Sequence, residues 1–217
     1  MTGANLVIAL DGPAAAGKGT LARRLAGHYN LAYLDSGTLY RGVGLTVLRQ
    51  GLDPTSESAA TRAAVAFRPE ILAEPEIRVE ATSQAASKVA AIPAVRAALL
   101  DWQRRFAAQP PAGKAGAVID GRDIGTVVCP DAKVKIFITA SVEARAERRF
   151  KELQAKGESV IYARVLEDMR ERDARDTVRS TSPMKPADDA LIIDTSALDA
   201  DQVFERARAY IDRRIQA

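Results

Sequence analysis

The segment LVIALDGPAAAGKGT, residues 6–20, determines the fold class of this chain. Residues 6–11 form a continuous apolar run that ends in a carboxylate, as buried parallel strands do. Residues 12–20 are rich in glycine and alanine, and the pattern that follows, with Leu21 and Leu25, is helical. A strand, a small-residue loop with a lysine and a helix form, in this order, the context of a phosphate-binding loop. The segment therefore predicts such a loop at the edge of a parallel sheet.

The composition of the loop indicates a triphosphate ligand. Small residues allow backbone N–H groups to turn inward, and the N-terminus of the following helix adds partial positive charge. We expect Lys18, as an exposed loop lysine, to bridge the β- and γ-phosphates, and Thr20 to reach Mg²⁺ directly or through water. Gly19 separates these two residues, whereas the simplest pattern of this kind places the hydroxyl directly after the lysine. The predicted ATP-binding loop consists of Gly12, Pro13, Ala14, Ala15, Ala16, Gly17, Lys18, Gly19 and Thr20.

The rest of the chain alternates strand and helix patterns. Apolar runs predict strands at residues 117–120, 133–140 and 190–194. Helices are expected from Pro93, from Ser141 to Lys156 before Gly157, and along a stripe from Val203 to Ile215. Residues 53–80 predict a small helical excursion, and residues 109–116 a loop. This alternation predicts an α/β domain around a parallel sheet.

Composition narrows the possible functions. The chain has 217 residues, of which 47% are hydrophobic and 27% charged, as in an ordinary globular protein of one domain. One cysteine and one histidine exclude an internal disulfide and disfavour a zinc site. No apolar run is long enough to span a bilayer, and no nucleic-acid-binding motif accompanies the 5% of aromatic residues. We expect a cytoplasmic monomer that binds neither membranes nor nucleic acid.

Two further motifs predict a second ligand site. In LDSGTLYR, residues 34–41, Ser36 lies at a helix entrance and Arg41 in its first turns, so both can face one phosphate. In DGRD, residues 120–123, Arg122 and Asp123 follow a strand, and ligands of open α/β sheets bind at that edge. The plainer interpretations are an N-cap with a surface arginine and a turn with a local ion pair.

The segment RERDARDTVR carries charged residues at helical spacing. Arg172, Arg175, Asp176 and Arg179 stand at positions i, i+3, i+4 and i+7, which predicts one polar stripe on a helix. Taken alone, such a stripe is more typical of a solvated surface. Beside a loop that binds a triphosphate, however, the arginines of such a stripe can compensate the negative charge that spreads over the phosphoryl group during transfer.

In combination, the motifs GPAAAGKGT, LDSGTLYR, SQAASKVAAIPAVR, VIDGRDIGTVV and RERDARDTVR resemble those of the bacterial cytidylate kinases over nearly the whole chain. The resemblance implies a P-loop NTPase fold of three layers, α/β/α, with a central parallel sheet in a single domain, residues 1–217. It also implies an acceptor (NMP-binding) insertion at about 36–111 and a helical lid at about 157–179. The implied reaction transfers the γ-phosphate of ATP to CMP or dCMP with Mg²⁺.

The same resemblance implies roles for individual residues. It assigns the reading of cytosine and the positioning of the nucleotide to Ser36, Ser87, Arg96 and Asp123. It assigns the binding of the acceptor phosphate to Arg41, Arg122 and Arg179. Arg172 and Asp176 would address the ribose. By looser analogy with other monophosphate kinases, Arg145 and Arg149 would lie over the ATP. The groups expected to act on the transferring phosphoryl group are Lys18, Arg122 and Arg179.

The chain departs from this family between residues 53 and 80, where it is shortened, and at 109–116, where it is slightly lengthened. Rival hypotheses are a kinase of the same fold with another acceptor (UMP, AMP or shikimate) and a non-catalytic nucleotide-binding regulator. A GTPase is disfavoured because the chain has no N-K-x-D motif.

Overall fold

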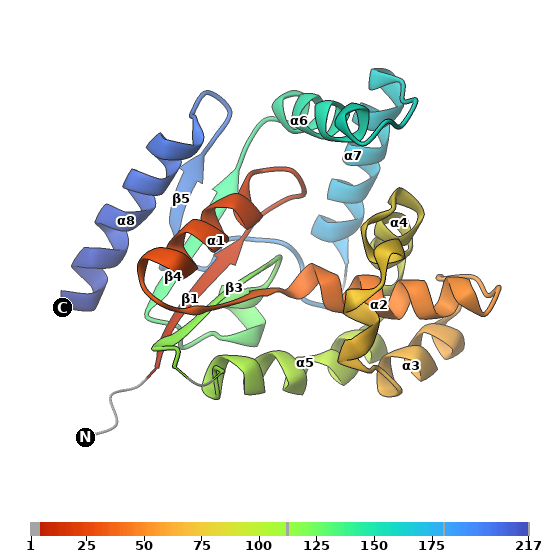
Figure 1. The fold of residues 1–217 in the computed structure, drawn as a ribbon, viewed down its shortest axis with the longest axis horizontal. Coiled ribbons are helices and arrows are strands. Elements are labelled where there is room, and N and C mark those ends of the chain that lie inside the picture. The colour runs from red at the N-terminus through yellow and green to blue at the C-terminus, as the bar shows by residue number, and fades with distance from the viewer. Residues whose placement is uncertain (1–4, 112, 180, 217) are drawn as a thin grey trace.

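The computed structural model describes residues 5–111, 113–179 and 181–216 and contains a five-stranded sheet in the order β2-β3-β1-β4-β5. All neighbouring strands are parallel, so their carboxyl ends lie at one edge. Figure 1 shows the sheet at the centre of the molecule. The strands are β1 (Leu6–Asp11), β2 (Ala32–Asp35), β3 (Gly116–Gly121), β4 (Val134–Thr139) and β5 (Leu191–Asp194).

Helices cover the sheet and extend beyond it (Figure 1). The α-helices are α1 (Lys18–His28), α2 (Ser36–Arg49), α3 (Glu57–Val65), α4 (Glu80–Val89), α5 (Pro93–Ala108), α6 (Val142–Ala155), α7 (Tyr162–Val178) and α8 (Ala200–Gln216). Short 3₁₀ turns span Pro69–Ala73 and Pro75–Arg78, and a π-helix spans Ile124–Val128. Within the described ranges, no helix has the length and apolar character needed to cross a membrane.

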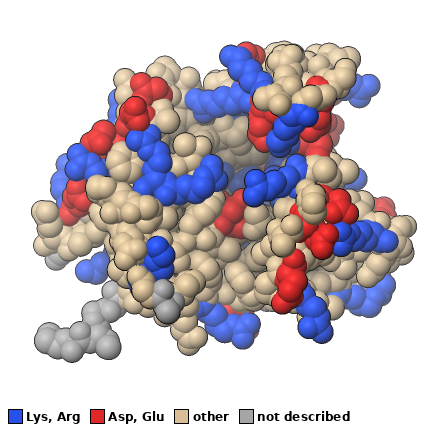
Figure 2. Space-filling view, in the orientation of Figure 1, with Lys and Arg blue, Asp and Glu red and all other residues tan. Residues whose placement is uncertain are grey.

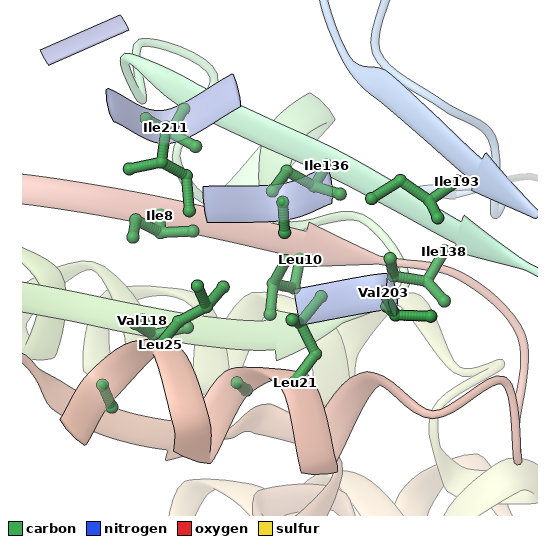
Figure 3. Close-up of a cluster of buried hydrophobic side chains, with 14 of the residues drawn as sticks. Ile8, Leu10, Leu21, Leu25, Val118, Ile136, Ile138, Ile193, Val203 and Ile211 are labelled. Carbon is green, nitrogen blue, oxygen red and sulfur yellow. The ribbon is translucent and has the colours of Figure 1, made fainter. Parts of the chain in front are cut away.

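The alternation of side chains along β1 creates a three-layer core. Ile8 and Leu10 point to the face covered by α1 and α8, where they pack with Leu25 and Ile211 (Figure 3). The residue between them, Ala9, points to the opposite face, covered by α5 and the π-helix. Burying each large aliphatic side chain contributes roughly 1.5–3 kcal/mol. The two cores hold the sheet edge in place, and the candidate site lies at that edge.

A separate hydrophobic core forms within helices α2 to α5. It contains Leu39, Val43 and Leu99 among its fully buried members. At Gly44 a Cβ atom would lie 3.0 Å from the Cβ of Ala85, so glycine permits the close approach of α2 and α4. These helices therefore have their own packing and extend from the sheet as a unit.

Several predicted elements are confirmed. Strand β1 has its predicted bounds, α5 begins at Pro93, and two helical turns and α3 occupy the predicted excursion at 53–80. The Ser141 hydroxyl caps α6 by accepting a hydrogen bond from the N–H of Ala144 at 3.2 Å, and Gly157 follows the helix with a φ of +80°.

Other predictions need correction. The short strand β2 and the π-helix were not predicted. The predicted stripe at residues 172–179 is also shorter than expected, because α7 ends at Val178 and Arg179 has extended backbone angles (φ −59°, ψ 137°). Arg179 therefore reaches the site from the end of the helix and not from its side.

The backbone at Gly12 generates the first prediction. Its φ is +139°, and a Cβ would lie 1.9 Å from the carbonyl oxygen of Ile138 on β4. We expect Gly12→Ala to lower the free energy of unfolding by about 3 kcal/mol or more, since backbone strain and overpacking act together. Urea unfolding measures this.

Gly27→Ala is the matched control for that experiment. Gly27 lies on the exposed side of α1, and a Cβ there meets no atom within 4 Å. Alanine should therefore stabilise the protein by about 0.5–1 kcal/mol through helix propensity. Equal stability of the two variants would contradict the packing derived for the start of the loop.

Candidate active site

A cleft of about 770 Å³ lies at the carboxyl edge of the sheet. Its walls come from the phosphate loop, from α2 and α4, from residues 120–123 after β3, and from the α6–α7 pair. Figure 2 shows lysine and arginine side chains gathered around the hollow on this face. The location and the charge of the cleft suit anionic ligands that bind at the ends of parallel strands.

The loop from Gly12 to Thr20 has the backbone of an anion-binding turn. Ala15 and Gly17 adopt positive φ values of +57° and +98°, and helix α1 begins directly afterwards at Lys18. Alternation of right- and left-handed residues turns successive N–H groups toward one centre, and the helix N-terminus adds partial positive charge. The loop is therefore built to hold phosphate groups.

Lys18 is buried, with 7% exposure, which corrects the expectation of an exposed lysine. Its Nζ donates a hydrogen bond to the carbonyl oxygen of Pro13 at 2.8 Å. Burial first, and the nearby Arg122 second, lower the pKa of Lys18 to about 7. A phosphate oxygen beside this ammonium group would restore the charged form.

Asp11, the last residue of β1, connects the two sides of the cleft. Its carboxylate accepts hydrogen bonds from the backbone N–H groups of Ile124 and Gly125, both at 2.7 Å. Burial raises the pKa of Asp11 to about 6, while these hydrogen bonds oppose the rise. The turn after β3 is thereby fixed directly beside the start of the phosphate loop.

Two carboxylates at neighbouring strand ends were not predicted as site residues. Asp35 and Asp120 are paired in the register of β2 and β3, and both line the cleft with Lys18. Burial, followed by the charge of Asp35, raises the pKa of Asp120 to about 6, and the hydroxyl of Tyr33 donates to Asp120 at 3.0 Å. The register of β2 would have revealed them, but β2 itself was not predicted.

The predicted base-reading residues come together from α2, α4, α5 and the turn after β3. Arg96 and Asp123 form an ion pair with side-chain exposures of only 8% and 7%. Arg96 also donates to the carbonyl oxygen of Ala90 at 3.2 Å, and its guanidinium lies 5.3 Å from the ring centre of Tyr40. Ser36 and Ser87 are buried in the same cleft wall, so the structure groups all four predicted residues.

Four arginines gather on the acceptor side: Arg41, Arg122, Arg172 and Arg179. Arg122 donates to Asp176 at 2.9 Å, and Arg179 approaches the same carboxylate at 3.9 Å. Burial, followed by the charge of Arg122, lowers the pKa of Arg172 to about 10. The positive charges are only partly compensated, which favours an anionic ligand at this position.

Three buried guanidinium nitrogens in the cleft have no hydrogen-bond partner among the described residues: Arg96 Nε, Arg172 Nε and Arg179 Nη2. An unmade hydrogen bond to a buried charged donor costs about 1–3 kcal/mol or more. Because buried polar groups are almost always paired, these donors indicate a ligand whose acceptor atoms complete them.

Arg145 and Arg149, which were expected to lie over ATP, are both bound to carboxylates of the protein in this structure. Arg145 does not line the cleft; it forms a bidentate ion pair with Asp173 of α7. Arg149 lines the cleft but is bound to Glu80 of α4 and, at 2.8 Å, to Glu152. The contacts with Asp173 and Glu80 were beyond prediction because these partners lie far away in the sequence and on other helices.

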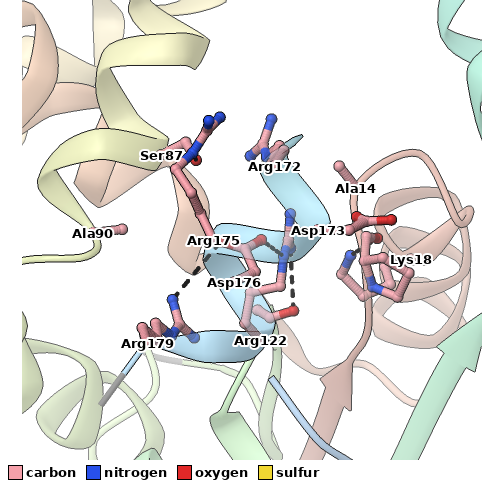
Figure 4. A network of polar contacts seen from close by, with 12 residues as sticks. Ala14, Lys18, Ser87, Ala90, Arg122, Arg172, Asp173, Arg175, Asp176 and Arg179 are labelled. Atoms are coloured by element: carbon pink, nitrogen blue, oxygen red, sulfur yellow. Dashed lines mark hydrogen bonds and ion pairs between the residues drawn. The ribbon is translucent and has the colours of Figure 1, made fainter. Parts of the chain in front are cut away.

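The sequence motifs did not single out Ser83, a further residue of the cleft. Ser83 on α4 accepts hydrogen bonds from Arg41 at 3.5 Å and Arg172 at 3.3 Å. Arg175 on α7 donates to the Ser87 hydroxyl at 3.3 Å. Figure 4 shows α7 passing between Ser87 and the phosphate loop. Ser83 stands one helical turn before Ser87 on the same helix face, and this spacing could have identified it from the sequence.

A phosphate loop, a parallel sheet and an arginine-rich cleft closed by helices define a P-loop phosphotransferase. The family model for cytidylate kinase matches residues 8–213. A cytidylate kinase of Paramagnetospirillum magneticum is 63% identical over 205 residues, covering 94% of this chain and 97% of that protein. The corresponding protein of Rhodospirillum rubrum is 56% identical over 202 residues, covering 93% and 95%. This chain belongs to the cytidylate kinase family of ATP-dependent phosphotransferases.

The similarity to solved structures supports the fold but does not indicate the activity. An uncharacterized protein from Eubacterium ventriosum aligns with a TM-score of 0.54 at 15% identity, covering 95% of this chain and 98% of its own. A sugar kinase from Janibacter sp. aligns with a TM-score of 0.52 at 13% identity, covering 96% and 95%. The expected three-layer α/β/α fold with a parallel sheet is confirmed.

The buried ion pair generates the second prediction. Asp123→Asn keeps the shape of the side chain but leaves the Arg96 charge uncompensated. We expect the free energy of unfolding without nucleotide to fall by about 3–5 kcal/mol. Chemical denaturation with and without CMP measures the change.

Glu143→Gln is the control for the ion-pair experiment. Glu143 contacts Arg170 at 3.4 Å, and both side chains are 60% exposed. Its substitution should change stability by less than about 1 kcal/mol. Equal effects of the two substitutions would contradict the role given to burial.

Proposed function

We propose that this chain transfers the γ-phosphate of ATP to CMP or dCMP, forming ADP and CDP or dCDP. The observation that carries the proposal is the set of buried, unpaired guanidinium nitrogens on Arg96, Arg172 and Arg179 in a cleft beside a phosphate loop. Among the described residues these donors have no acceptor, and their side chains line a part of the cleft that would bind a second ligand beside the donor triphosphate. A non-catalytic regulator that binds only ATP has no use for them.

On the donor side, the phosphate loop would bind the triphosphate of ATP. Backbone N–H groups of residues 14–20 would surround the β-phosphate, and Lys18 would exchange its hydrogen bond with the Pro13 carbonyl for phosphate oxygens. The lysine would follow the phosphoryl group during transfer, because its long side chain can contact both phosphates. Charge compensation of this kind is the main catalytic contribution in phosphoryl transfer.

The residues present fit a magnesium ion. Among the described residues, no three His, Cys, Asp or Glu side chains cluster as a metal site. Mg²⁺ in kinases needs few protein ligands, because phosphate oxygens and waters complete its octahedron. Thr20, Asp35 and Asp120 line the cleft and offer oxygen atoms. They would hold the ion directly or through water, and the ion would neutralise charge on the β- and γ-phosphates.

On the acceptor side, Arg41, Arg122, Arg172 and Arg179 would surround the phosphate of CMP. Asp176, which binds Arg122 at 2.9 Å and lines the same cleft, would accept a hydrogen bond from a ribose hydroxyl. We assign the acceptor site to the helical segment at about 36–111, and the lid to about 157–179. The placement of α2 and α4 against α7 supports both assignments, because their residues share one cleft.

Discrimination of cytosine would depend on Asp123 and Arg96. A carboxylate accepts a hydrogen bond from the exocyclic amine of cytosine, whereas uracil presents a carbonyl oxygen at that position. Ser36 and Ser87 line the same wall of the cleft and can satisfy the remaining polar atoms. A site that hydrogen-bonds one substrate group strongly rejects an analogue lacking it. This disfavours UMP as the main acceptor.

The reaction needs positioning more than covalent chemistry. In-line placement of the CMP phosphate oxygen and the γ-phosphate can supply about 7–11 kcal/mol of the barrier reduction. Helix α7 separates the cleft from solvent and carries Arg172 and Asp176, so it would exclude water from the transferring group. We also expect the enzyme to be a monomer. We expect it to act in the cytoplasm.

An acceptor screen tests the proposed function. We expect ADP release from ATP and Mg²⁺ to be strongly stimulated by CMP and dCMP, weakly by UMP, and very little by AMP, shikimate or buffer alone. Coupled detection of ADP by the purified protein measures this. Strong stimulation by a different acceptor would overturn the assignment of Asp123 and Arg96, and a lack of stimulation by all acceptors would favour a regulator.

Substitution of the loop lysine tests the donor site. We expect Lys18→Met to reduce the turnover number by about 10²–10³-fold, because one preorganised charge is removed from the transferring group. The folded state should change by only about 1–2 kcal/mol, since Lys18 makes one hydrogen bond, to Pro13. Lys151→Met, on the exposed face of α6, is the control. Near-normal turnover in the Lys18 variant would refute the assignment.

A further inference from the structure

Arg145 forms a junction of three elements. Its Nε donates to the carbonyl oxygen of Ala140 after β4 at 2.9 Å, and its Nη1 reaches the carbonyl oxygen of Ala14 in the phosphate loop at 3.5 Å. The two Nη atoms bind Asp173 of α7 at 3.1 and 2.5 Å. A bidentate pair of this kind fixes orientation as well as distance. The lid helix is thus held to the donor loop at one point.

Helix α7 carries the acceptor contacts from neighbouring turns. Asp176, one turn after Asp173, binds Arg122, and Arg175 donates to Ser87. Figure 4 shows Asp173 close to Ala14 and Lys18, with Arg179 and Ser87 on the other side of the helix. Because these residues lie on one rigid helix, a shift of Asp173 moves the acceptor contacts with it.

Apolar packing reinforces the same junction. Ala14 and Ala15 of the loop pack against a small cluster between α6 and α7 that contains Ala146, Val165 and Met169. This cluster is separate from the two cores of the sheet. The loop and α7 therefore share a contact surface whose polar end is the Arg145–Asp173 pair.

The contacts of Arg145 argue against a direct role in binding ATP. Each of its three guanidinium nitrogens already has a partner, and the side chain is only 5% exposed. To reach a phosphate it would have to leave a buried, bidentate carboxylate, which costs more than an exposed pair would. The cleft-lining arginines of α6 are Arg148 and Arg149 instead.

We propose that Arg145 and Asp173 are positioning residues that couple the two nucleotide sites. ATP binds to the loop, the loop contacts Arg145 through Ala14, and Arg145 holds α7, which carries Arg172 and Asp176 into the CMP site. The inference rests on the proposed function, since it concerns how one reaction orders its two substrates. Binding of either nucleotide should then strengthen binding of the other by the same factor.

Calorimetric titration of CMP, with and without the β,γ-imido analogue of ATP and Mg²⁺, tests the coupling. In the wild-type protein, we expect the analogue to tighten CMP binding by roughly 5–150-fold. In Asp173→Asn this enhancement should fall to about twofold or less, while CMP binding alone stays within about threefold of wild type. A purely structural role would weaken CMP binding equally in both conditions.

The matched control is Glu167→Gln, which replaces an exposed carboxylate on the same helix by an amide. This variant should keep the full enhancement of CMP binding. Arg145→Lys is a second variant, because lysine keeps the charge but loses the bidentate geometry. If Arg145→Lys folds poorly, the test of the coupling rests on Asp173→Asn alone.

Two outcomes would overturn the inference. The first is an enhancement that is retained in Asp173→Asn; if this variant also binds the ATP analogue alone more tightly, Arg145 is an ATP ligand. The second is an enhancement that is absent from the active wild-type protein. If the wild-type protein binds no CMP in either condition, the proposed function itself fails.

Discussion

The two hydrogen bonds that the Asp11 carboxylate accepts from the N–H groups of Ile124 and Gly125 join the start of the phosphate loop to the turn after β3. The geometry of the whole cleft depends on this connection. Asp11 precedes the first glycine of the phosphate loop, and Ile124 follows Asp123, whose carboxylate holds Arg96. One buried side chain therefore sets the distance between the donor and acceptor sides of the cleft. Its pKa is raised to about 6, so the hydrogen bonds and the nearby Lys18 compensate the cost of burial only in part.

The residues that stabilise the fold and the residues of the candidate site lie in different parts of the structure. The two cores on either side of the sheet are apolar and contain the largest fully buried side chains, such as Ile8, Leu10 and Ile119. The cleft, in contrast, brings together arginines and carboxylates whose charges are incompletely matched. Proteins tolerate such arrangements at functional sites because the surrounding scaffold supplies the stability. The charge pattern is complete only when phosphates are present.

Elements with strong local signals could be predicted from the sequence. Strand β1 and the loop after it, the start of α5 at Pro93 and the Ser141 cap depend on neighbours in the chain, so local patterns contain the information. Strand β2 has only four residues, two of them merely half buried, and it forms mainly because β3 lies beside it. Tertiary pairing of this kind leaves little trace in a single sequence.

The site shows the same division. The motifs located the loop, Arg122, Asp123 and the arginines of α7, because each stands at a strand end or at helical spacing. The partners of Arg145 and Arg149, Asp173 and Glu80, lie 28 and 69 residues away in the chain. Many surface acids could equally have paired with these arginines, and only the folded arrangement selects between them.

The contacts between the lid and the acceptor helices affect the timing of catalysis. Arg149 binds Glu80, Arg172 contacts Ser83 and Arg175 contacts Ser87, so α6 and α7 are joined to α4 across the cleft. Separating α4 from α6 and α7 requires that several of these bonds break together. A catalytic cycle in which nucleotides pass between these helices includes an opening step and a closing step in addition to the chemistry. Where opening is slower than phosphoryl transfer, the departure of the diphosphate products determines how fast the enzyme works.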